Sequence, residues 1–426
     1  MHQFFKSTFF NFEAIRILGT APFGGADVAE CLDAIGQITD KDADSWHLAW
    51  NDQAEKAEAL AEDARNLGNA AESRRAYLRA SNYFRASGYM FNDRPQTPDA
   101  RVIPIAERVI KNFQQATKYF EGEVHLLEIP YQGYTLPAYL YLPAAENRLP
   151  GKTPILLNTG GADSVQEELY YIYGSSGPGL GYAVLTFEGP GQGIVLRRHK
   201  IHMRPDWEVV TSAVLDHLFD FSDKHPDTNL DLDRIAIAGA SMGGYYALRG
   251  ASDPRFKACV SIDPFYDMWE FATHHISPTF ISGWTSGWIS DGFVNGTIGL
   301  LSKLDFQLKW EVNVASWFFN VETPAETLKE MKKYTLKDGF LARVKSPVLV
   351  SGAAHSLYFN PIYHSLSVYN GLTALNEEDK QVWMPDSPGE GGLQAKVGAF
   401  GISAQRTFQF LDEVFKVDRA NGFIKV

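Results

Sequence analysis

The chain has 426 residues, 45% of them hydrophobic, and carries a formal net charge of -12 at pH 7. This length is sufficient for two packed units. Because the negative charge repels phosphate backbones and anionic lipid headgroups, we expect neither nucleic acid nor a membrane surface as a partner.

The N-terminal segment and the cysteines indicate a soluble, cytoplasmic protein. Charges at Lys6, Glu13 and Arg16 interrupt the first residues, and no window reaches the roughly 20 apolar residues of a membrane span. Only Cys31 and Cys259 are present, without metal-ligand spacing. We therefore expect no disulfide framework, no metal and no organic cofactor. The sequence leaves the oligomeric state open, a homodimer included.

Residues 1–120 are predicted to form an N-terminal helical domain. From Asp40 to Lys118 the chain is rich in Ala, Glu, Arg and Leu, and its apolar residues recur at helical offsets. The positions expected on the buried face are Ala57, Leu60, Ala64, Leu67, Ala71 and Leu78. A helical layer with such a face packs against a neighbouring unit.

Residues 121–264 and 344–426 are predicted to form an α/β core. The stretches VHLLEIPY and LPAYLYLP, joined by the turn Gln132-Gly133, indicate an antiparallel strand pair. Apolar runs such as PILLNTGG, RIAIAGASMGG and PVLVSGAA follow, and segments of helical length separate many of them. This alternation predicts a mostly parallel sheet with helices on both faces.

Residues 265–343 do not continue the alternation. The segment is rich in aromatic residues, as in WEFATHHISPTFISGWTSGWISDGFV. An insertion of this length after a core strand is usually functional. We predict an aromatic cap that, with the N-terminal helices, covers the carboxyl ends of the strands, where α/β sheets bind ligands.

The run Gly239-Ala240-Ser241-Met242-Gly243 carries the central chemical prediction. It lies between the strand RIAIA and the helix-compatible YYALRG. A serine on a sharp strand-to-helix turn has a strained backbone, and glycines two residues away on either side relieve the crowding. The sequence therefore predicts the nucleophile elbow of the α/β-hydrolase fold, with Ser241 as nucleophile. The alternative is an ordinary glycine-rich turn.

A serine nucleophile needs hydrogen-bond donors for the negative oxygen that develops during the reaction. The backbone N–H of Met242 is one expected donor, and the loop that contains Gly161 and Ala162 is expected to supply the other. Asp163 follows directly in that loop. Its carboxylate is interpreted either as a general acid or base or as the N-cap of the next helix.

The motifs NTGGADSVQEE, LTFEGPGQG, GASMGG, SIDPFYDMWEF, VSGAAHSLYF and GEGGLQAKVGAF resemble those of fungal polyketide-pathway α/β hydrolases of the fusarin and cytochalasan type. The resemblance covers the chain from about residue 120 to the end. More distantly, the chain is similar to the fungal heptaketide hydrolase and the bacterial 2,6-dihydropseudooxynicotine hydrolase. These two imply hydrolysis of a carbon–carbon bond next to a carbonyl group by serine, histidine and aspartate.

The usual triad is incomplete in this sequence. The acid is expected in the loop after PVLVSG, where His355 stands instead, and the histidine is expected within residues 391–396. No histidine follows His364. One hypothesis makes His355 itself the base for Ser241, oriented by an acidic residue. The acids considered for this orientation are Asp263, Asp267 and Glu390.

Two further hypotheses remain open. His274 or His275 of the cap could supply the base, or hydrolysis is lost and the pocket directs cyclisation, aldol-type condensation or lactam closure of a reactive polyketide. Lys396 is a further candidate for the missing base if burial lowers the pKa of its ammonium group. The alternative is that Lys396 is a solvated loop residue. A cavity lining is also expected from one acid and four aromatic residues, namely Glu188, Trp269, Trp284, Tyr358 and Phe359.

The sequence thus predicts a serine-dependent α/β hydrolase that acts on a carbonyl compound of fungal secondary metabolism. The expected substrate is a small, apolar polyketide with a carbon–carbon, ester or lactone bond to be cleaved. Two alternatives remain, a non-hydrolytic cyclase or condensation catalyst and a catalytically silent ligand-binding protein.

Overall fold

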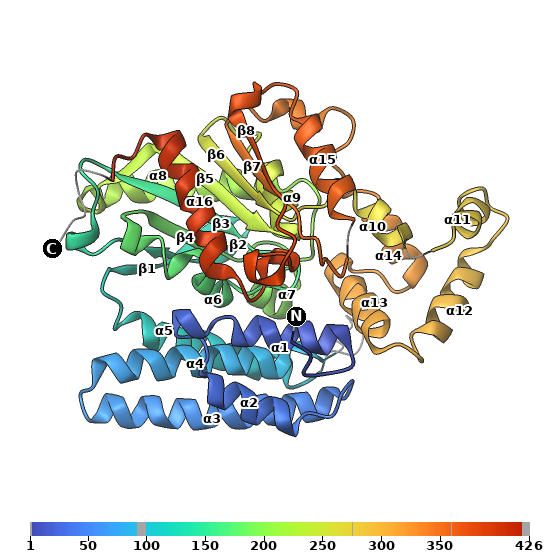
Figure 1. Ribbon diagram of the computed structural model, residues 1–426, viewed down its shortest axis with the longest axis horizontal. Helices are drawn as coiled ribbons and strands as arrows, with labels where there is room; N and C mark the ends of the chain where they lie inside the picture. The colour runs from blue at the N-terminus through green and yellow to red at the C-terminus, as the bar shows by residue number, and fades with distance from the viewer. Residues whose placement is uncertain (1, 92–98, 275, 359, 420–426) are drawn as a thin grey trace.

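The computed structural model describes residues 2–91, 99–274, 276–358 and 360–419. Its centre is an eight-stranded sheet with the order β1-β2-β4-β3-β5-β6-β7-β8 (Figure 1). The first two strand pairs are antiparallel and the remaining pairs are parallel. The strands are β1 (Val124–Tyr131), β2 (Tyr134–Tyr141), β3 (Thr153–Thr159), β4 (Ala183–Phe187), β5 (Leu230–Ala240), β6 (Phe256–Ile262), β7 (Val348–Ser351) and β8 (Lys380–Trp383).

Helices cover both faces of the sheet. All residues of β3 and β4 are buried, as expected for strands without a solvated face. On one face the strands pack with α8 (Glu208–Lys224) and α9 (Met242–Gly250), and on the other with α16 (Phe400–Phe415). The predicted α/β-hydrolase architecture is confirmed.

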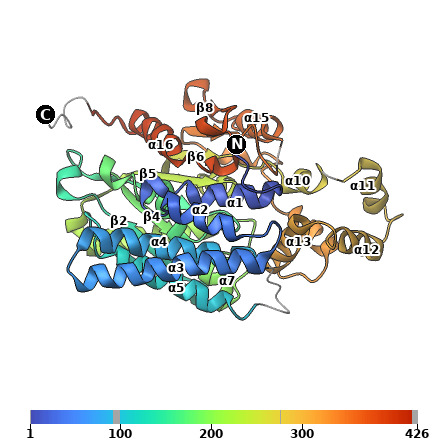
Figure 2. The same ribbon diagram turned by 60° about the horizontal axis from the view of Figure 1, so that its bottom comes forward.

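In the described residues, five α-helices precede the sheet and together form an N-terminal layer beside it (Figure 2). They are α1 (Thr8–Leu18), α2 (Val28–Gln37), α3 (Ala43–Asn66), α4 (Ala70–Tyr89) and α5 (Val102–Thr117). The predicted buried face is wrong in part, because Leu60 is 52% and Leu67 is 85% exposed. Ala57 is buried as predicted, and the buried side of α3 also includes Trp46 and Trp50, whose indole rings pack together.

In the described part of the segment between β6 and β7, five α-helices lie at one side of the sheet (Figure 1). They are α10 (Met268–His274), α11 (Pro278–Thr285), α12 (Asp291–Leu301), α13 (Phe306–Phe319) and α14 (Pro324–Met331). Helix α13 joins this segment to the N-terminal layer, because the Trp310 ring stacks on Tyr89 at 5.1 Å between centroids and its Nε1 donates to the Tyr89 carbonyl at 2.9 Å. Among the described residues, none of the helices has the length and apolar character to cross a bilayer.

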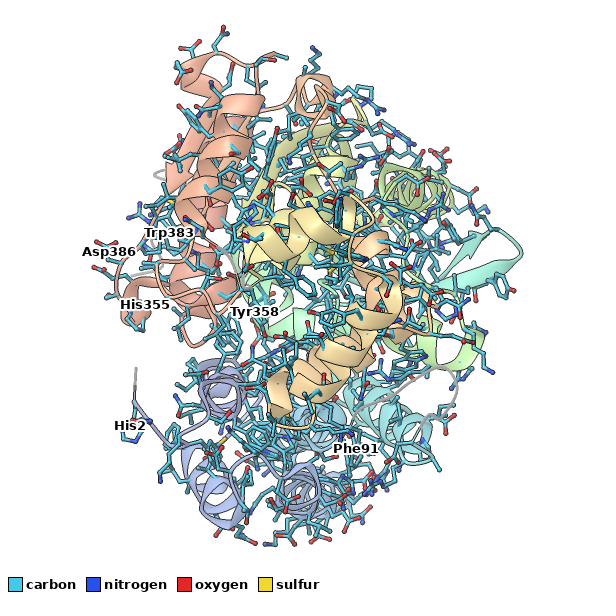
Figure 3. All side chains as sticks on the ribbon, turned by 90° about the vertical axis from the view of Figure 1, so that its right-hand side faces the viewer. His2, Phe91, His355, Tyr358, Trp383 and Asp386 are labelled. Atoms are coloured by element: carbon cyan, nitrogen blue, oxygen red, sulfur yellow. The ribbon has the colours of Figure 1, made fainter. Side chains whose placement is uncertain are left out.

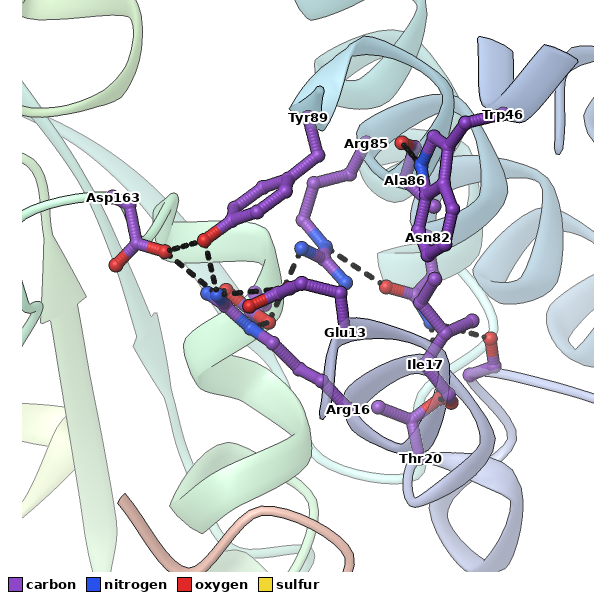
Figure 4. A network of polar contacts seen from close by, with 12 residues as sticks. Glu13, Arg16, Ile17, Thr20, Trp46, Asn82, Arg85, Ala86, Tyr89 and Asp163 are labelled. Atoms are coloured by element: carbon purple, nitrogen blue, oxygen red, sulfur yellow. Dashed lines mark hydrogen bonds and ion pairs between the residues drawn. The ribbon is translucent and has the colours of Figure 1, made fainter. Parts of the chain in front are cut away.

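A buried charge network ties α1 to the core (Figure 4). Arg16 donates to both carboxylate oxygens of Glu168, at 2.6 and 2.5 Å, and to Asp163 at 2.7 Å. Arg85 of α4 lies 3.3 Å from Glu168 and adds a second cation. Since the Arg16 side chain is only 9% exposed, water screens these interactions little.

Arg16→Met is expected to lower the free energy of unfolding by about 3–5 kcal/mol, because it leaves Glu168 and Asp163 with less compensation inside the protein. Urea-induced unfolding measures this effect. Arg75→Met is the matched control, since Arg75 and its partner Glu72 are both exposed, and it should leave the midpoint nearly unchanged. Equal midpoints for the two variants would contradict the role of Arg16.

Candidate active site

Ser241 occupies a strained turn between β5 and α9. Its φ and ψ of 57° and -118° lie outside the favoured regions for a residue with a side chain. Tight packing holds this conformation: a Cβ on Gly239 would lie 2.2 Å from the Gly243 carbonyl oxygen, and one on Gly243 would lie 2.7 Å from the Thr159 carbonyl oxygen. The Ser241 N–H donates to the Ile262 carbonyl at 2.8 Å.

The loop after β3 lies directly beside this turn. A Cβ on Gly161 would lie 3.3 Å from the carbonyl oxygen of Ala240 and 3.8 Å from the backbone nitrogen of Gly243. The buried Gln192 side chain fixes the loop, because its Nε2 donates to the carbonyls of Gly160 and Gly161 at 2.8 and 3.0 Å. The residues predicted as oxyanion donors are thus brought to Ser241, and their role in catalysis stays a prediction.

Ser241, Met242, Gly161, Ala162 and Asp163 line one cavity. It encloses about 1170 Å³, its mouth included, and all three parts of the chain contribute to its wall. Most of the wall is apolar or aromatic, and the contributing side chains include Phe12, Tyr89, Ile172, Phe265, Met268, Trp310, Phe318, Val397 and Phe400. Such a chamber suits an apolar ligand with a few polar groups.

Of the aromatic residues predicted to line the cavity, Tyr358 lies at the Ser241 cavity, whereas Trp269 and Trp284 do not. Tyr358 lines the cavity and lies between the cap and the N-terminal layer in Figure 3. Trp269 and Trp284 instead pack with each other and with Leu328 inside the cap, because the segment is large enough to form its own small core. Phe359 lies outside the described residues.

Asp163 faces the cavity and is held in the ionised form. Burial alone would raise the pKa of its carboxyl group, but the Arg16 charge and hydrogen bonds from Tyr89 and Arg16 lower the pKa below its ordinary value. The N-cap interpretation is not supported, since no capping bond from Asp163 is present at α6 (Gln166–Leu169), where Val165 is the N-cap residue. The sequence analysis did not identify Arg16 and Tyr89 as site residues, although the charged pair Glu13 and Arg16 in the aromatic and apolar segment TFFNFEAIRIL is a usable signal.

His355 does not reach the cavity. Its side chain is exposed, it lies at the edge of the molecule in Figure 3, and its backbone N–H donates to the Gly392 carbonyl at 2.8 Å. The acids proposed to orient it have other partners: Asp263 pairs with Lys396, Asp267 with Lys337, and Glu390 with Ser387. The structure therefore gives no support to a Ser241–His355 dyad.

Among the residues whose side chains are described, no histidine lines the cavity. His275 and the side chain of His274 lie outside that set, so the hypothesis of a cap histidine stays open. Within the same set, no cluster of His, Cys, Asp or Glu is arranged to hold a metal ion.

The alternative interpretation of Lys396 as a solvated loop residue is wrong. The side chain is completely buried, and its Nζ lies 2.7 Å from Asp263 Oδ1. Burial lowers the pKa of the ammonium group, and the Asp263 charge opposes this shift. The neighbouring Gln394 is the residue of this loop that meets the cavity with a polar side chain, which the sequence did not reveal.

Glu188 has a structural position rather than a place beside Ser241. Its oxygens accept from the backbone N–H groups of Gln166 and Ile194, at 3.2 and 2.6 Å, and so cap two helix starts. It lines a second cavity that shares Tyr89, Ala162 and Asp163 with the first. Glu188 therefore lines a cavity that adjoins the Ser241 cavity but not the Ser241 cavity itself, and its contact with substrate stays a prediction.

The model of the FrsA-like esterase family matches residues 32–273. This chain belongs to that family of α/β hydrolases. This chain is 56% identical over 424 residues to the hydrolyase poxO of Penicillium oxalicum, and the alignment covers 98% of this chain and 100% of that protein. It is 54% identical over 433 residues to the hydrolyase ccsE of Aspergillus clavatus, covering 98% and 99%.

Solved structures agree on the fold of this hydrolase. The 2,6-dihydroxy-pseudo-oxynicotine hydrolase superposes with a TM-score of 0.68 at 20% identity, covering 95% of this chain and 96% of that chain. The protein named AbyA5 superposes with a TM-score of 0.60 at 18% identity, covering 92% and 91%. Both likenesses extend over the helical layer, the sheet and the cap together.

Glu13→Gln is expected to flatten the pH dependence of stability. Burial raises the pKa of Glu13 to about 7, although the Arg16 charge opposes this shift. In the unfolded chain the pKa of a glutamate is about 4.3. The folded state then binds this proton more tightly, so the free energy of unfolding falls as pH rises from about 4.3 to 7. In urea-induced unfolding across this pH range, the free energy of unfolding should decline less steeply in Glu13→Gln than in the wild type. The control Glu378→Gln, at an exposed position, should decline as steeply as the wild type.

Proposed function

We propose that this hydrolase acts through Ser241 on a carbonyl group of a small, apolar polyketide. The strained presentation of Ser241 beside the Gly161 loop, at the wall of an apolar cavity, carries this proposal. The fungal origin of the relatives and their names as hydrolyases support a role in fungal secondary metabolism. The bond attacked belongs to an ester, a lactone or a ketone.

In the proposed reaction the Ser241 oxygen attacks the carbonyl carbon. The carbonyl oxygen becomes negative and accepts hydrogen bonds from the backbone N–H of Met242 and from the loop at Gly161 and Ala162. Asp163 takes the hydroxyl proton and returns it to the leaving group. Water then cleaves the ester formed with Ser241. Asp163 is assigned this role because it is an ionised carboxylate in the cavity wall and no described histidine is there.

The absence of an imidazole in the described cavity wall favours a second candidate, condensation or cyclisation within one polyketide. A serine without a strong base is a poor nucleophile. The same backbone donors would stabilise an enolate oxygen, and Asp163 would take the proton from the carbon between two carbonyl groups. The two reactions differ in mass balance, since hydrolysis adds one water and condensation to a new double bond releases one.

Ser241→Ala is expected to lower turnover of the polyketide substrate by several orders of magnitude, because the attacking oxygen is lost. Mass spectrometry of the product distinguishes gain of water from loss of water. Ser286→Ala, a serine exposed on the cap, is the control and should retain activity. Unchanged turnover in Ser241→Ala would contradict the proposed function, and binding without turnover in the wild type would indicate a silent ligand-binding protein.

The pH profile tests the role of Asp163. Because the Arg16 charge and the hydrogen bonds from Tyr89 and Arg16 outweigh burial and lower the pKa of Asp163 below its ordinary value, its carboxylate is ionised near neutral pH. We therefore expect activity to be nearly flat from about pH 5 to 8, whereas an imidazole base gives a rise near roughly 6.5. Asp163→Asn should lower activity about 100-fold or more. Glu13 lines the same cavity and has a pKa of about 7, so the profile is also measured in Glu13→Gln. A rise centred near 6.5 in both the wild type and Glu13→Gln would instead point to a histidine.

A further inference from the structure

The loop after β8 brings Gln394 to the cavity of Ser241. Its side chain is 2% exposed and lines the cavity. The next two residues, Ala395 and Lys396, have positive φ values of 56° and 57°, although neither is glycine. Consecutive residues in this region are costly and persist only where the surroundings enforce them. Residues 391–396 are also the segment where a triad histidine was expected.

Two hydrogen bonds fix the Gln394 amide. Its Nε2 donates to the backbone carbonyl of Asp263 at 3.0 Å, and its Oε1 accepts from the Ser356 hydroxyl at 2.6 Å. A side-chain amide has two N–H donors and two acceptor lone pairs. These contacts therefore leave one donor and one acceptor for a molecule in the cavity.

A buried ion pair lies directly behind the amide. Lys396 Nζ lies 2.7 Å from Asp263 Oδ1 and donates to the Gly352 carbonyl at 3.2 Å, and the Trp383 ring centroid is 4.6 Å away. Ser351 Oγ also donates to Asp263 Oδ1, at 2.7 Å. Asp263 Oδ2 is buried and has no hydrogen-bond partner in the described structure.

The geometry points to Gln394 as the ligand-binding residue that stands where a triad would have histidine, with the Asp263–Lys396 pair as its positioning residues. This inference rests on the proposed function only in placing the reacting carbonyl beside Ser241. The free N–H of Gln394 donates to a carbonyl or hydroxyl oxygen of the ligand. Because an amide does not titrate near neutral pH, this position gives Ser241 no base.

Gln394→His tests this placement by gain of function. The free Asp263 Oδ2 is available to accept a hydrogen bond from the N–H of an imidazole at position 394, which would then act as the base for Ser241. We expect Ser241 to be labelled by a fluorophosphonate at least about 100-fold faster than in the wild type, with a rise near roughly pH 6.5. Gln394→Met, of similar length but without the amide, is the control and should label no faster than the wild type.

The binding role has a separate measurement. In a Ser241→Ala background, a long-chain methyl ketone should bind severalfold more weakly when Gln394→Met is added, because one hydrogen bond is lost. Exposed Gln37→Met is the matched control and should bind like the background. This binding measurement also tests the inference if the Gln394→His variant does not fold.

Equal labelling rates and pH profiles in the wild type and folded Gln394→His would overturn the inference, as would unchanged ketone binding in Gln394→Met. Failure of the proposed function is distinguishable, because it appears as retained turnover in Ser241→Ala, whatever the labelling of Gln394→His.

Discussion

The positive φ of Ser241 is the constraint on which the site depends. A side chain in this conformation is presented at the tip of the turn between β5 and α9, and the contacts of Gly239 and Gly243 leave no room for a relaxed alternative. The same crowding brings the Gly161 loop within contact of the turn. The sheet fixes both segments because β3 and β5 are neighbouring parallel strands, so their following loops emerge side by side.

The cavity depends on segments far from this turn. Arg16 and Tyr89 reach Asp163 from the N-terminal helices (Figure 4). Trp310 of the cap packs on Tyr89. Burial strengthens these charge interactions and makes the position of Asp163 sensitive to α1. The helical layer is therefore part of the site's electrostatics as well as of its wall. Gln394 lies in the segment where a histidine was expected, and neither its amide nor the buried Asp263–Lys396 pair supplies an imidazole.

The sequence predicted what is determined locally. Strands of Val, Ile and Leu separated by helices, and the glycines around Ser241, were sufficient for the fold and the turn, because backbone sterics and period set both. The sequence analysis failed for side chains whose interaction partner is far away in the sequence. Lys396 is buried by Asp263, 133 residues away, and Arg16 pairs with Asp163 at a separation of 147. The cap tryptophans were misplaced because an aromatic composition does not say which core the rings enter.

A structure with a bound trifluoromethyl ketone tests the central claim most directly, since the ketone carbonyl reports where the reacting group lies. The account predicts its carbon in contact with or bonded to Ser241 Oγ, its oxygen accepting from the backbone N–H of Met242, and its chain along the apolar wall. A ketone bound elsewhere, or with its oxygen turned away from Met242, would contradict it.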